Sequence, residues 1–178
     1  MKNLSVMIKP ASSLCNMRCK YCFYADISSI REQPSYGVMT SDTRKKVLSN
    51  IFSQLDSGDS ITFAFQGGEP TMAGIGWFRQ FIQEARQLAG DGIQISYAFQ
   101  TNGLLLDDDW LNLFKEHHFL VGLSLDGPKD FHDRNRPDAH GNGTFAHLLD
   151  IKKKMDRLHV SYNILTVLTN AAARHPQK

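Results

Sequence analysis

Short apolar runs alternate with longer helical patterns along the chain. Runs rich in β-branched and aromatic residues, typical of buried strands, cover residues 4–9, 60–66, 93–100, 119–125 and 160–168. Between most of these runs, apolar side chains recur at helical spacing. Strands separated by helices favour βα units, so the pattern predicts an α/β fold with a parallel sheet.

The predicted helices have recognisable limits. The first begins near Ser41, ends before Gly58 and has apolar positions at Val47, Leu48, Ile51, Phe52 and Leu55. The second ends at Gly90 and is expected to direct inward Phe78, Phe81, Ile82, Ala85 and Leu88. Asp107 is the predicted N-cap of a third helix, which contains Trp110, and a fourth covers residues 145–158. Residues 26–40 are polar and irregular and predict a long loop.

The loops after the first four strands carry the unusual sequences. A cysteine-rich loop follows the first strand, and the next three are followed by Gly67-Gly68-Glu69-Pro70, Thr101-Asn102-Gly103 and Asp126-Gly127-Pro128. In parallel α/β folds the chemistry collects at the carboxyl ends of the strands, so these four loops predict one site. A complete eight-unit barrel takes about 250 residues. We therefore expect residues 1–178 to form one domain, a partial (β/α) barrel that is incomplete at the C-terminus.

Three cysteines lie within eight residues in the pattern C-x3-C-x2-C, at Cys15, Cys19 and Cys22. An odd number at this density does not form a disulfide framework. Unrelated thiols and a structural zinc site remain alternatives, although zinc sites of that kind have four ligands and the nearest downstream histidine is His117. The spacing favours a [4Fe–4S] cluster with one iron left open.

Composition excludes several classes of protein. The chain has 178 residues, is 42% hydrophobic and 21% charged, and carries a formal net charge of +2. No Lys/Arg run is longer than Lys152-Lys153-Lys154, which is too short to indicate nucleic-acid binding. No apolar stretch approaches the roughly 20 residues that span a bilayer, and residues 4–8 are too few for a secretory signal core. We expect a soluble, cytoplasmic protein with no membrane partner.

The cysteine motif with its neighbours Phe23-Tyr24 resembles the radical S-adenosylmethionine (SAM) superfamily. The whole chain is similar to anaerobic sulfatase-maturating enzymes, through residues 8–13 (IKPASS), 65–71 (FQGGEPT), 100–103 (QTNG) and 121–128 (VGLSLDGP). The resemblance implies a partial barrel of the radical SAM type with a [4Fe–4S] cluster on the three cysteines and SAM on the open iron. It also implies reductive cleavage of SAM and oxidation of a Cys or Ser of a sulfatase to Cα-formylglycine. The implied partners are the sulfatase polypeptide and an electron donor such as flavodoxin or ferredoxin.

The resemblance also suggests which residues contact SAM. Gly68, in a loop where Gly67 allows close backbone approach, is expected to meet the amino group, and Tyr21 to lie on the adenine side. Arg136, with Arg134 as its rival, can form a forked contact with the carboxylate. The remaining candidates are Ser124 for ribose or carboxylate, Glu69 as an ammonium partner or a solvated carboxylate, and Asn102 and Asp126 for ribose, substrate or a turn.

The chain also departs from the family. The full-length relatives carry a cysteine-rich C-terminal domain with two auxiliary clusters and a general-base aspartate, and no cysteine follows Cys22 here. No catalytic base is therefore predicted within residues 1–178, and we expect cluster assembly without turnover of a sulfatase peptide. Two other functions remain open, namely another radical SAM peptide maturase, such as a thioether-forming enzyme, and a non-catalytic cluster- or zinc-binding remnant.

Overall fold

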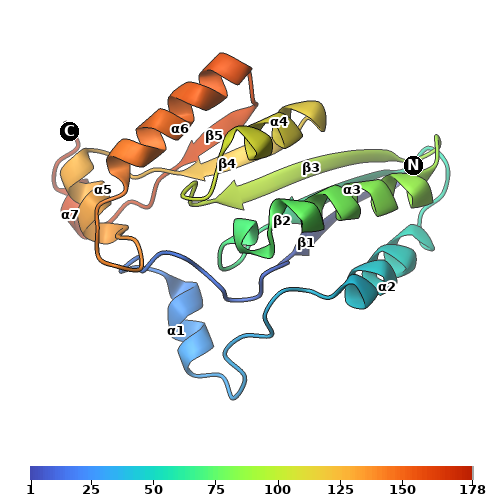
Figure 1. Ribbon diagram of the computed structural model, residues 1–178, viewed down its shortest axis with the longest axis horizontal. Coiled ribbons are helices and arrows are strands. Elements are labelled where there is room, and N and C mark those ends of the chain that lie inside the picture. The colour runs from blue at the N-terminus through green and yellow to red at the C-terminus, as the bar shows by residue number, and fades with distance from the viewer. Residues whose placement is uncertain (178) are drawn as a thin grey trace.

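The computed structural model describes residues 1–177, which form an α/β fold around one sheet (Figure 1). The sheet has five parallel strands in the order in which they occur along the chain. The strands are β1 (Asn3–Ile8), β2 (Ser60–Phe65), β3 (Gln94–Thr101), β4 (Leu120–Ser124) and β5 (Tyr162–Leu165). The helices are α1 (Phe23–Ser29), α2 (Ser41–Phe52), α3 (Ile75–Ala89), α4 (Asp108–Glu116), α5 (Lys129–Asn135), α6 (Phe145–Leu158) and α7 (Asn170–Ala173), with a 3₁₀ turn η1 (Pro70–Ala73). The predicted open, parallel fold is confirmed.

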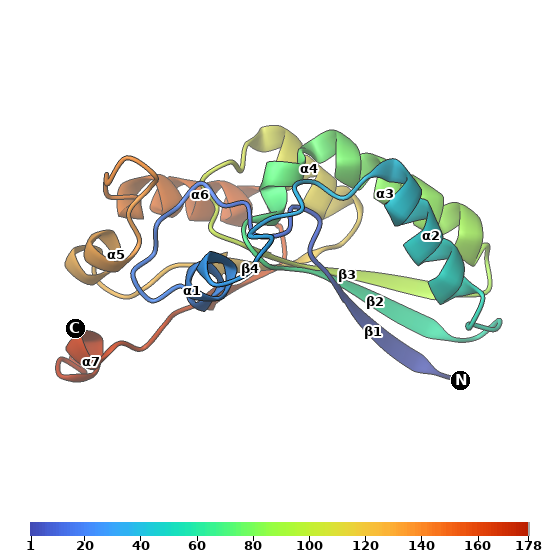
Figure 2. The ribbon, with the colours of Figure 1, turned by 90° about the horizontal axis from the view of Figure 1, so that it is seen from below.

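The longer helices cover one face of the sheet. Figure 2 shows α2, α3, α4 and α6 together on the same side of the strands. Alternate side chains of β2, namely Ile61, Phe63 and Phe65, are buried under them. The ring of Phe65 lies 5.0 Å from that of Phe78 and 5.0 Å from that of Phe81, both edge-on. This aromatic packing fixes the end of β2, from which the loop of residues 66–69 departs.

The intervening side chains of β2 and β3 point to the opposite face. They are only partly buried or exposed, and they are small or uncharged: Ser60, Thr62, Ala64, Gln66, Ser96, Ala98 and Gln100. Because parallel strands packed on both faces are usually apolar throughout, this composition indicates a face that is not closed by a helix layer. The two faces of the sheet therefore differ sharply in chemistry.

The structure corrects several predicted boundaries. Helix α1 occupies the start of the predicted loop at 26–40, and it has no buried residue, so it lacks the apolar periodicity that would have revealed it. Leu88 is 47% exposed rather than inward, because Ala85 and Ala89 already occupy the buried stripe of α3 at that end. Strand β5 is shorter than the predicted 160–168, since β4 offers pairing only from Val121 to Ser124.

Other local predictions are confirmed. Asp107 caps α4, and its Oδ1 accepts a hydrogen bond from the Trp110 amide at 3.0 Å. The predicted helices after Ser41 and over residues 145–158 are present. Within residues 1–177, none of the helices combines the length and the apolar character needed to cross a bilayer.

Candidate functional site

A cavity of about 430 Å³ lies at the carboxyl ends of the strands. Four predicted segments supply its walls: Cys15, Met17, Cys19, Tyr21 and Cys22 from the cysteine loop, Gln66 to Glu69 after β2, Gln100 to Asn102 at the end of β3, and Ser124 at the end of β4. Phe23, Tyr24, Arg136 and residues 165–167 complete the lining. Three of the four loops singled out from the sequence thus meet around one space. The fourth, Asp126-Gly127-Pro128, lies outside the lining of this cavity, and its Asp126 is hydrogen-bonded to Tyr21.

The three cysteines are reduced and partly exposed to this cavity. Backbone hydrogen bonds hold their loop from two sides. The Arg18 and Lys20 amides donate to the carbonyls of Pro137 and Asn135 at 3.0 and 2.9 Å, and the Glu69 amide donates to the Leu14 carbonyl at 2.7 Å. The loop is therefore held from outside by the end of α5 with the residues that follow it, and by the loop after β2.

Burial raises the pKa of the Cys15 thiol, and it raises the pKa of Cys19 to about 11 although Arg136 acts in the opposite direction. A thiol in such surroundings becomes a thiolate when a bound metal supplies the missing positive charge. Among residues 1–177, no three His, Cys, Asp or Glu side chains are grouped closely enough to hold a single metal ion. Three thiols that line one cavity can act as cluster ligands in their thiolate form.

Gly68 packs against the backbone that leads into the cysteine loop, and Gly67 packs against the side chain of Lys9. Both have left-handed backbone conformations, with φ of +85° and +54°. A Cβ atom on Gly68 would lie 2.4 Å from the Leu14 carbonyl oxygen, and one on Gly67 would lie 2.6 Å from the Lys9 side chain. The approach to a ligand predicted for this loop stays a prediction. In this structure, backbone before the first cysteine is closest to Gly68, and the Lys9 side chain is closest to Gly67.

We expect Gly68→Ala to lower the free energy of unfolding by about 2 kcal/mol or more and to reduce iron incorporation, because backbone atoms cannot move aside as a flexible side chain can. Gly76→Ala is the matched control. Gly76 lies in α3 with an ordinary φ and nothing within 4 Å of its added Cβ, so alanine should stabilise the helix by about 0.5–1 kcal/mol. Thermal and urea unfolding of both variants under reducing conditions measures the difference. Equal stability of the two variants would contradict the assigned role of Gly68.

Glu69 is buried and accepts four hydrogen bonds. Its Oε1 accepts from the Thr71 amide at 3.0 Å and from the hydroxyls of Thr71 and Thr101 at 2.8 Å each, and its Oε2 accepts from the Asn102 amide at 2.7 Å. Burial raises the pKa of the carboxyl, and these hydrogen bonds oppose that shift. The alternative of a solvated carboxylate is wrong, because the side chain ties the loop after β2 to the loop after β3.

Asn102 and Ser124 also have protein partners. Asn102 Nδ2 donates to Asn16 Oδ1 at 2.7 Å, and Asn102 Oδ1 accepts from the Leu104 amide at 3.0 Å, so this side chain joins the end of β3 to the cysteine loop. Ser124 Oγ accepts from Gln100 Nε2 at 2.9 Å, which leaves its hydroxyl hydrogen free to donate toward a ligand. Both side chains line the cavity.

Tyr21, Asp126 and Arg136 form a connected group at the cavity wall. The Tyr21 hydroxyl donates to Asp126 Oδ2 at 2.6 Å and accepts from Arg136 Nη1 at 3.0 Å. Burial, followed by the hydrogen bond to Asp126, raises the pKa of Tyr21, so the phenol keeps the proton that it donates. Arg136 is only 5% exposed, and its Nε is buried without a hydrogen-bond partner within residues 1–177. A buried guanidinium with an unused donor calls for an anionic ligand.

His132 holds this group in place and was not singled out as a site residue by sequence. It is fully buried, and its Nδ1 accepts from the Asp126 amide at 3.2 Å. Its Nε2 lies 2.9 Å from the Thr144 hydroxyl, which in turn donates to the Arg136 carbonyl at 2.9 Å. An Nδ1 that accepts requires the neutral ring with its proton on Nε2, consistent with the lowering of the His132 pKa by burial and by Arg136.

The two candidate arginines differ in their position relative to the cavity. Arg136 lines the cavity, whereas Arg134 does not and lies in the last turn of α5. Residues 165–167 were missed as site residues because the sequence predicts them within a strand. The Val167 amide donates to Asp126 Oδ1 at 3.1 Å, which brings the end of β5 to the Tyr21 group.

Comparison with known proteins places this cavity in context. A sequence model described as the radical SAM superfamily matches residues 10–171. Over all 178 residues, the chain is 45% identical to a cysteine-type anaerobic sulfatase-maturating enzyme from Clostridium novyi (strain NT). The match covers 47% of that relative. The chain is also 35% identical to a serine-type anaerobic sulfatase-maturating enzyme from Klebsiella aerogenes. That match covers 96% of this chain and 41% of the relative.

A solved structure described as native anSMEcpe with bound AdoMet and Kp18Cys peptide superposes with a TM-score of 0.90 and 39% identity. That match covers 99% of this chain and 46% of the solved one. The chain thus spans about half the length of the curated relatives and of the solved structure that it matches.

Proposed function

The chain belongs to the radical SAM superfamily, and from this membership we propose that Cys15, Cys19 and Cys22 hold a [4Fe–4S] cluster beside a bound SAM molecule. One observation carries the proposal: the three thiols line the same cavity as a buried arginine that lacks an anionic hydrogen-bond partner within residues 1–177. The thiolates would supply three of the four cluster ligands, and the arginine would meet the carboxylate of SAM.

The cavity residues have the chemistry that SAM requires. We infer that Arg136 and Ser124 donate to its carboxylate and ribose, since both carry unused donors at the cavity wall. The Gly67-Gly68 backbone meets the amino group, while Tyr21 flanks the adenine side. Glu69 and Asn102, which face the cavity but are engaged by protein groups, contribute chiefly by holding the loops at fixed positions.

When bound and reduced, the cluster and SAM supply a 5′-deoxyadenosyl radical able to remove a hydrogen atom from a substrate. The protein positions SAM and excludes water around it. We propose that the substrate is a sulfatase polypeptide and that the residue oxidised to Cα-formylglycine is a cysteine. The identities favour cysteine, because the cysteine-type relatives are 40–45% identical to this chain and the serine-type relatives 29–35%.

The reaction needs one electron from outside the site, which we assign to a flavodoxin- or ferredoxin-type donor protein. A cluster of this kind is maintained in a reducing compartment, so we place the protein in the cytoplasm.

Electron paramagnetic resonance of the anaerobically reconstituted, dithionite-reduced protein, with and without SAM, tests the proposal. We expect a [4Fe–4S]⁺ signal whose g values shift when SAM is added, because SAM binds the open iron. Each single substitution Cys15→Ala, Cys19→Ala and Cys22→Ala should abolish that signal, since a two-thiolate site does not retain the cluster. Stoichiometric zinc in place of iron, or an iron signal indifferent to SAM, would refute the proposal.

A further inference from the structure

The cysteine loop has two chemically different sides. Cys15, Met17, Cys19 and Tyr21 line the cavity, whereas the intervening residues Arg18 and Lys20 are exposed and are not part of its lining. This alternation is expected for an extended segment, in which successive side chains point to opposite sides. The amides of Arg18 and Lys20 are bonded to the segment after α5, so the alternation is held in place. The result is two cations on the outer side of the loop that carries the thiols.

Arg18 and Lys20 are exposed cations that no carboxylate of the described residues neutralises. Five lysines elsewhere pair with carboxylates, in Lys2–Asp56, Lys129–Asp133, Lys152–Asp156, Lys153–Asp150 and Lys154–Asp108. The exposed Lys45 and Lys46 of α2 form no ion pair within the described residues, but they lie outside the cysteine loop. Arg18 Nη1 instead donates to the carbonyls of Cys15 and Met17 at 3.1 and 2.9 Å, which fixes its charge over the loop. In the part of the chain that the structure describes, neither Arg18 nor Lys20 forms an ion pair.

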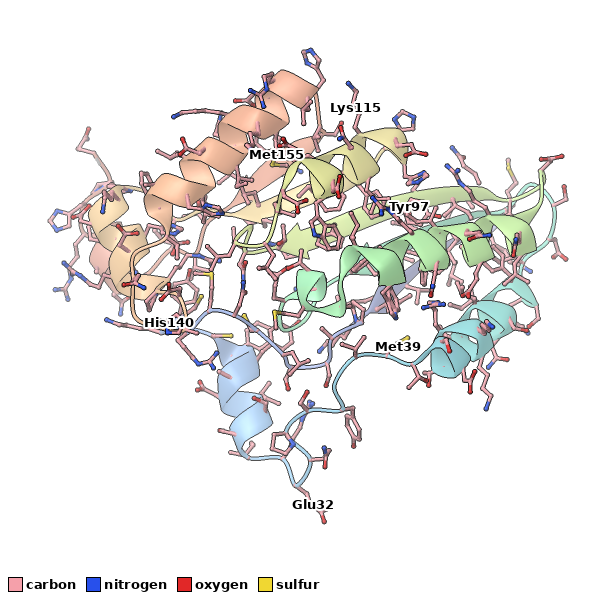
Figure 3. The ribbon with its side chains drawn as sticks, viewed as in Figure 1. Glu32, Met39, Tyr97, Lys115, His140 and Met155 are labelled. Atoms are coloured by element: carbon pink, nitrogen blue, oxygen red, sulfur yellow. The ribbon has the colours of Figure 1, made fainter. Side chains whose placement is uncertain are left out.

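The adjoining surface contains one carboxylate that lies directly beside the cysteine loop, that of Asp138. Met17 forms a bridge to Asp138, and His140 lies on the same loop between α5 and α6, where Figure 3 labels it. The Asp138 carboxylate accepts hydrogen bonds from the His140 amide and from the backbone and side chain of Asn142, and it forms no ion pair with Arg18 or Lys20. Asp26 lies in the first turn of α1, which follows the cysteine loop.

We propose that Arg18 and Lys20 form the docking surface for an acidic one-electron donor protein of the flavodoxin type. The inference rests on the proposed function, because it requires a [4Fe–4S] cluster behind these residues. In the step, a flavin hydroquinone gives one electron to the oxidised [4Fe–4S]²⁺ cluster, which becomes [4Fe–4S]⁺, and the flavin becomes a semiquinone. Approach from the outer side keeps the donor close to the thiols and leaves the cavity to SAM and the substrate.

The chemistry of the surface fits a short-lived encounter. Transient redox complexes use small contact areas, and exposed charges at their rims govern the association rate more than the affinity. Unpaired cations fixed beside the electron acceptor raise the local concentration of an acidic partner, and this steering weakens as salt screens the charges. The interaction is therefore expected to depend strongly on ionic strength.

The test is the rate of cluster reduction by photoreduced flavodoxin, followed anaerobically by stopped-flow absorbance at low and at high salt. The double variant Arg18→Glu/Lys20→Glu should be reduced at least ~10-fold more slowly at low salt, and its rate should approach that of the wild type at high salt. Lys20→Glu alone should show a smaller slowing in the same direction. The Lys20 side chain donates no hydrogen bond to the loop carbonyls, unlike that of Arg18. The single variant therefore tests the docking surface even if the double variant disturbs the loop.

Lys45→Glu/Lys46→Glu is the matched control, since these exposed lysines of α2 lie far from the cysteine loop and the charge change is the same (Figure 1). The control should be reduced within about two-fold of the wild-type rate. Equal slowing in the control, or a wild-type rate in an Arg18/Lys20 variant with full iron content, would overturn the docking assignment. Dithionite reduction and the SAM-dependent signal should be unchanged in all variants, and their absence in the wild type would instead refute the proposed function.

Discussion

Arg136→Met is expected to weaken SAM binding by roughly 30- to 150-fold, which corresponds to about 2–3 kcal/mol for a lost charge-assisted contact. The Arg136 guanidinium is 5% exposed and uses Nη1 on Tyr21, while its Nε has no partner within residues 1–177. Such a group has already lost its hydration when the pocket is formed, so a carboxylate gains a strong partner at little further cost. Equilibrium dialysis of SAM against the anaerobically reconstituted protein measures the effect.

Two further variants separate recognition of the carboxylate from general charge. Arg136→Lys keeps the cation but loses the planar fork, and we expect an intermediate loss of about 10-fold. Arg134→Met removes the same charge two residues away, on a side chain that does not line the cavity, and should leave affinity unchanged. Iron content and the [4Fe–4S]⁺ signal must match the wild type in each case. Equal losses for Arg134→Met and Arg136→Met would contradict a direct contact.

The order of the strands and the place of the site follow from sequence patterns. Apolar runs locate β1 to β4 because side chains such as Phe63 and Val121 must be buried, and the connection lengths require parallel pairing. Once the strands are parallel, their carboxyl ends meet at one edge, which brings the cysteine loop to Gly67-Gly68 and Asn102. This much of the site is a consequence of topology.

The parts that escaped prediction depend on contacts that the spacing of apolar residues does not encode. His132 reads as an ordinary polar residue of a surface segment, yet it is buried because Asp126 and Thr144, from two other segments, supply its partners. Helix α1 has no buried residue, so its sequence shows no helical periodicity of apolar positions. Similarly, nothing local shows that Arg136 rather than Arg134 reaches the cavity, since the choice is made by the backbone hydrogen bonds of residues 18–20 with 135–137.

Glu69 belongs to a loop motif of the site, but its carboxylate binds protein groups that hold the site together. The loop sequence suggested an ammonium partner, whereas the carboxylate already accepts four hydrogen bonds from Thr71, Thr101 and Asn102. Its burial is tolerated because these donors replace water. The loops that carry Gly68 and Asn102 both contact the cysteine loop. By holding these two loops together, the carboxylate indirectly fixes the positions of the thiols.

Glu69→Gln is therefore expected to lower the free energy of unfolding by about 2–4 kcal/mol, although the change is nearly isosteric. An amide retains one accepting oxygen, but its nitrogen is a donor and would face either the Asn102 amide or the three donors at Oε1. At least one buried donor must then remain without a partner. Removing the buried charge offsets part of this cost, since burial raises the pKa of Glu69, but it does not restore the missing acceptor.

Urea unfolding of the Glu69→Gln variant, beside Glu116→Gln on the exposed end of α4, measures the cost against a surface control with the same chemical change. Glu116→Gln should be indistinguishable from the wild type, because exposed ion pairs contribute little. Glu69→Gln should also assemble less cluster per chain, since Gly68 and Asn102 would no longer hold the cysteine loop from both sides. Wild-type stability together with a selective loss of SAM binding would show instead that the carboxylate acts on the ligand directly, and would return Glu69 to the role of ammonium partner.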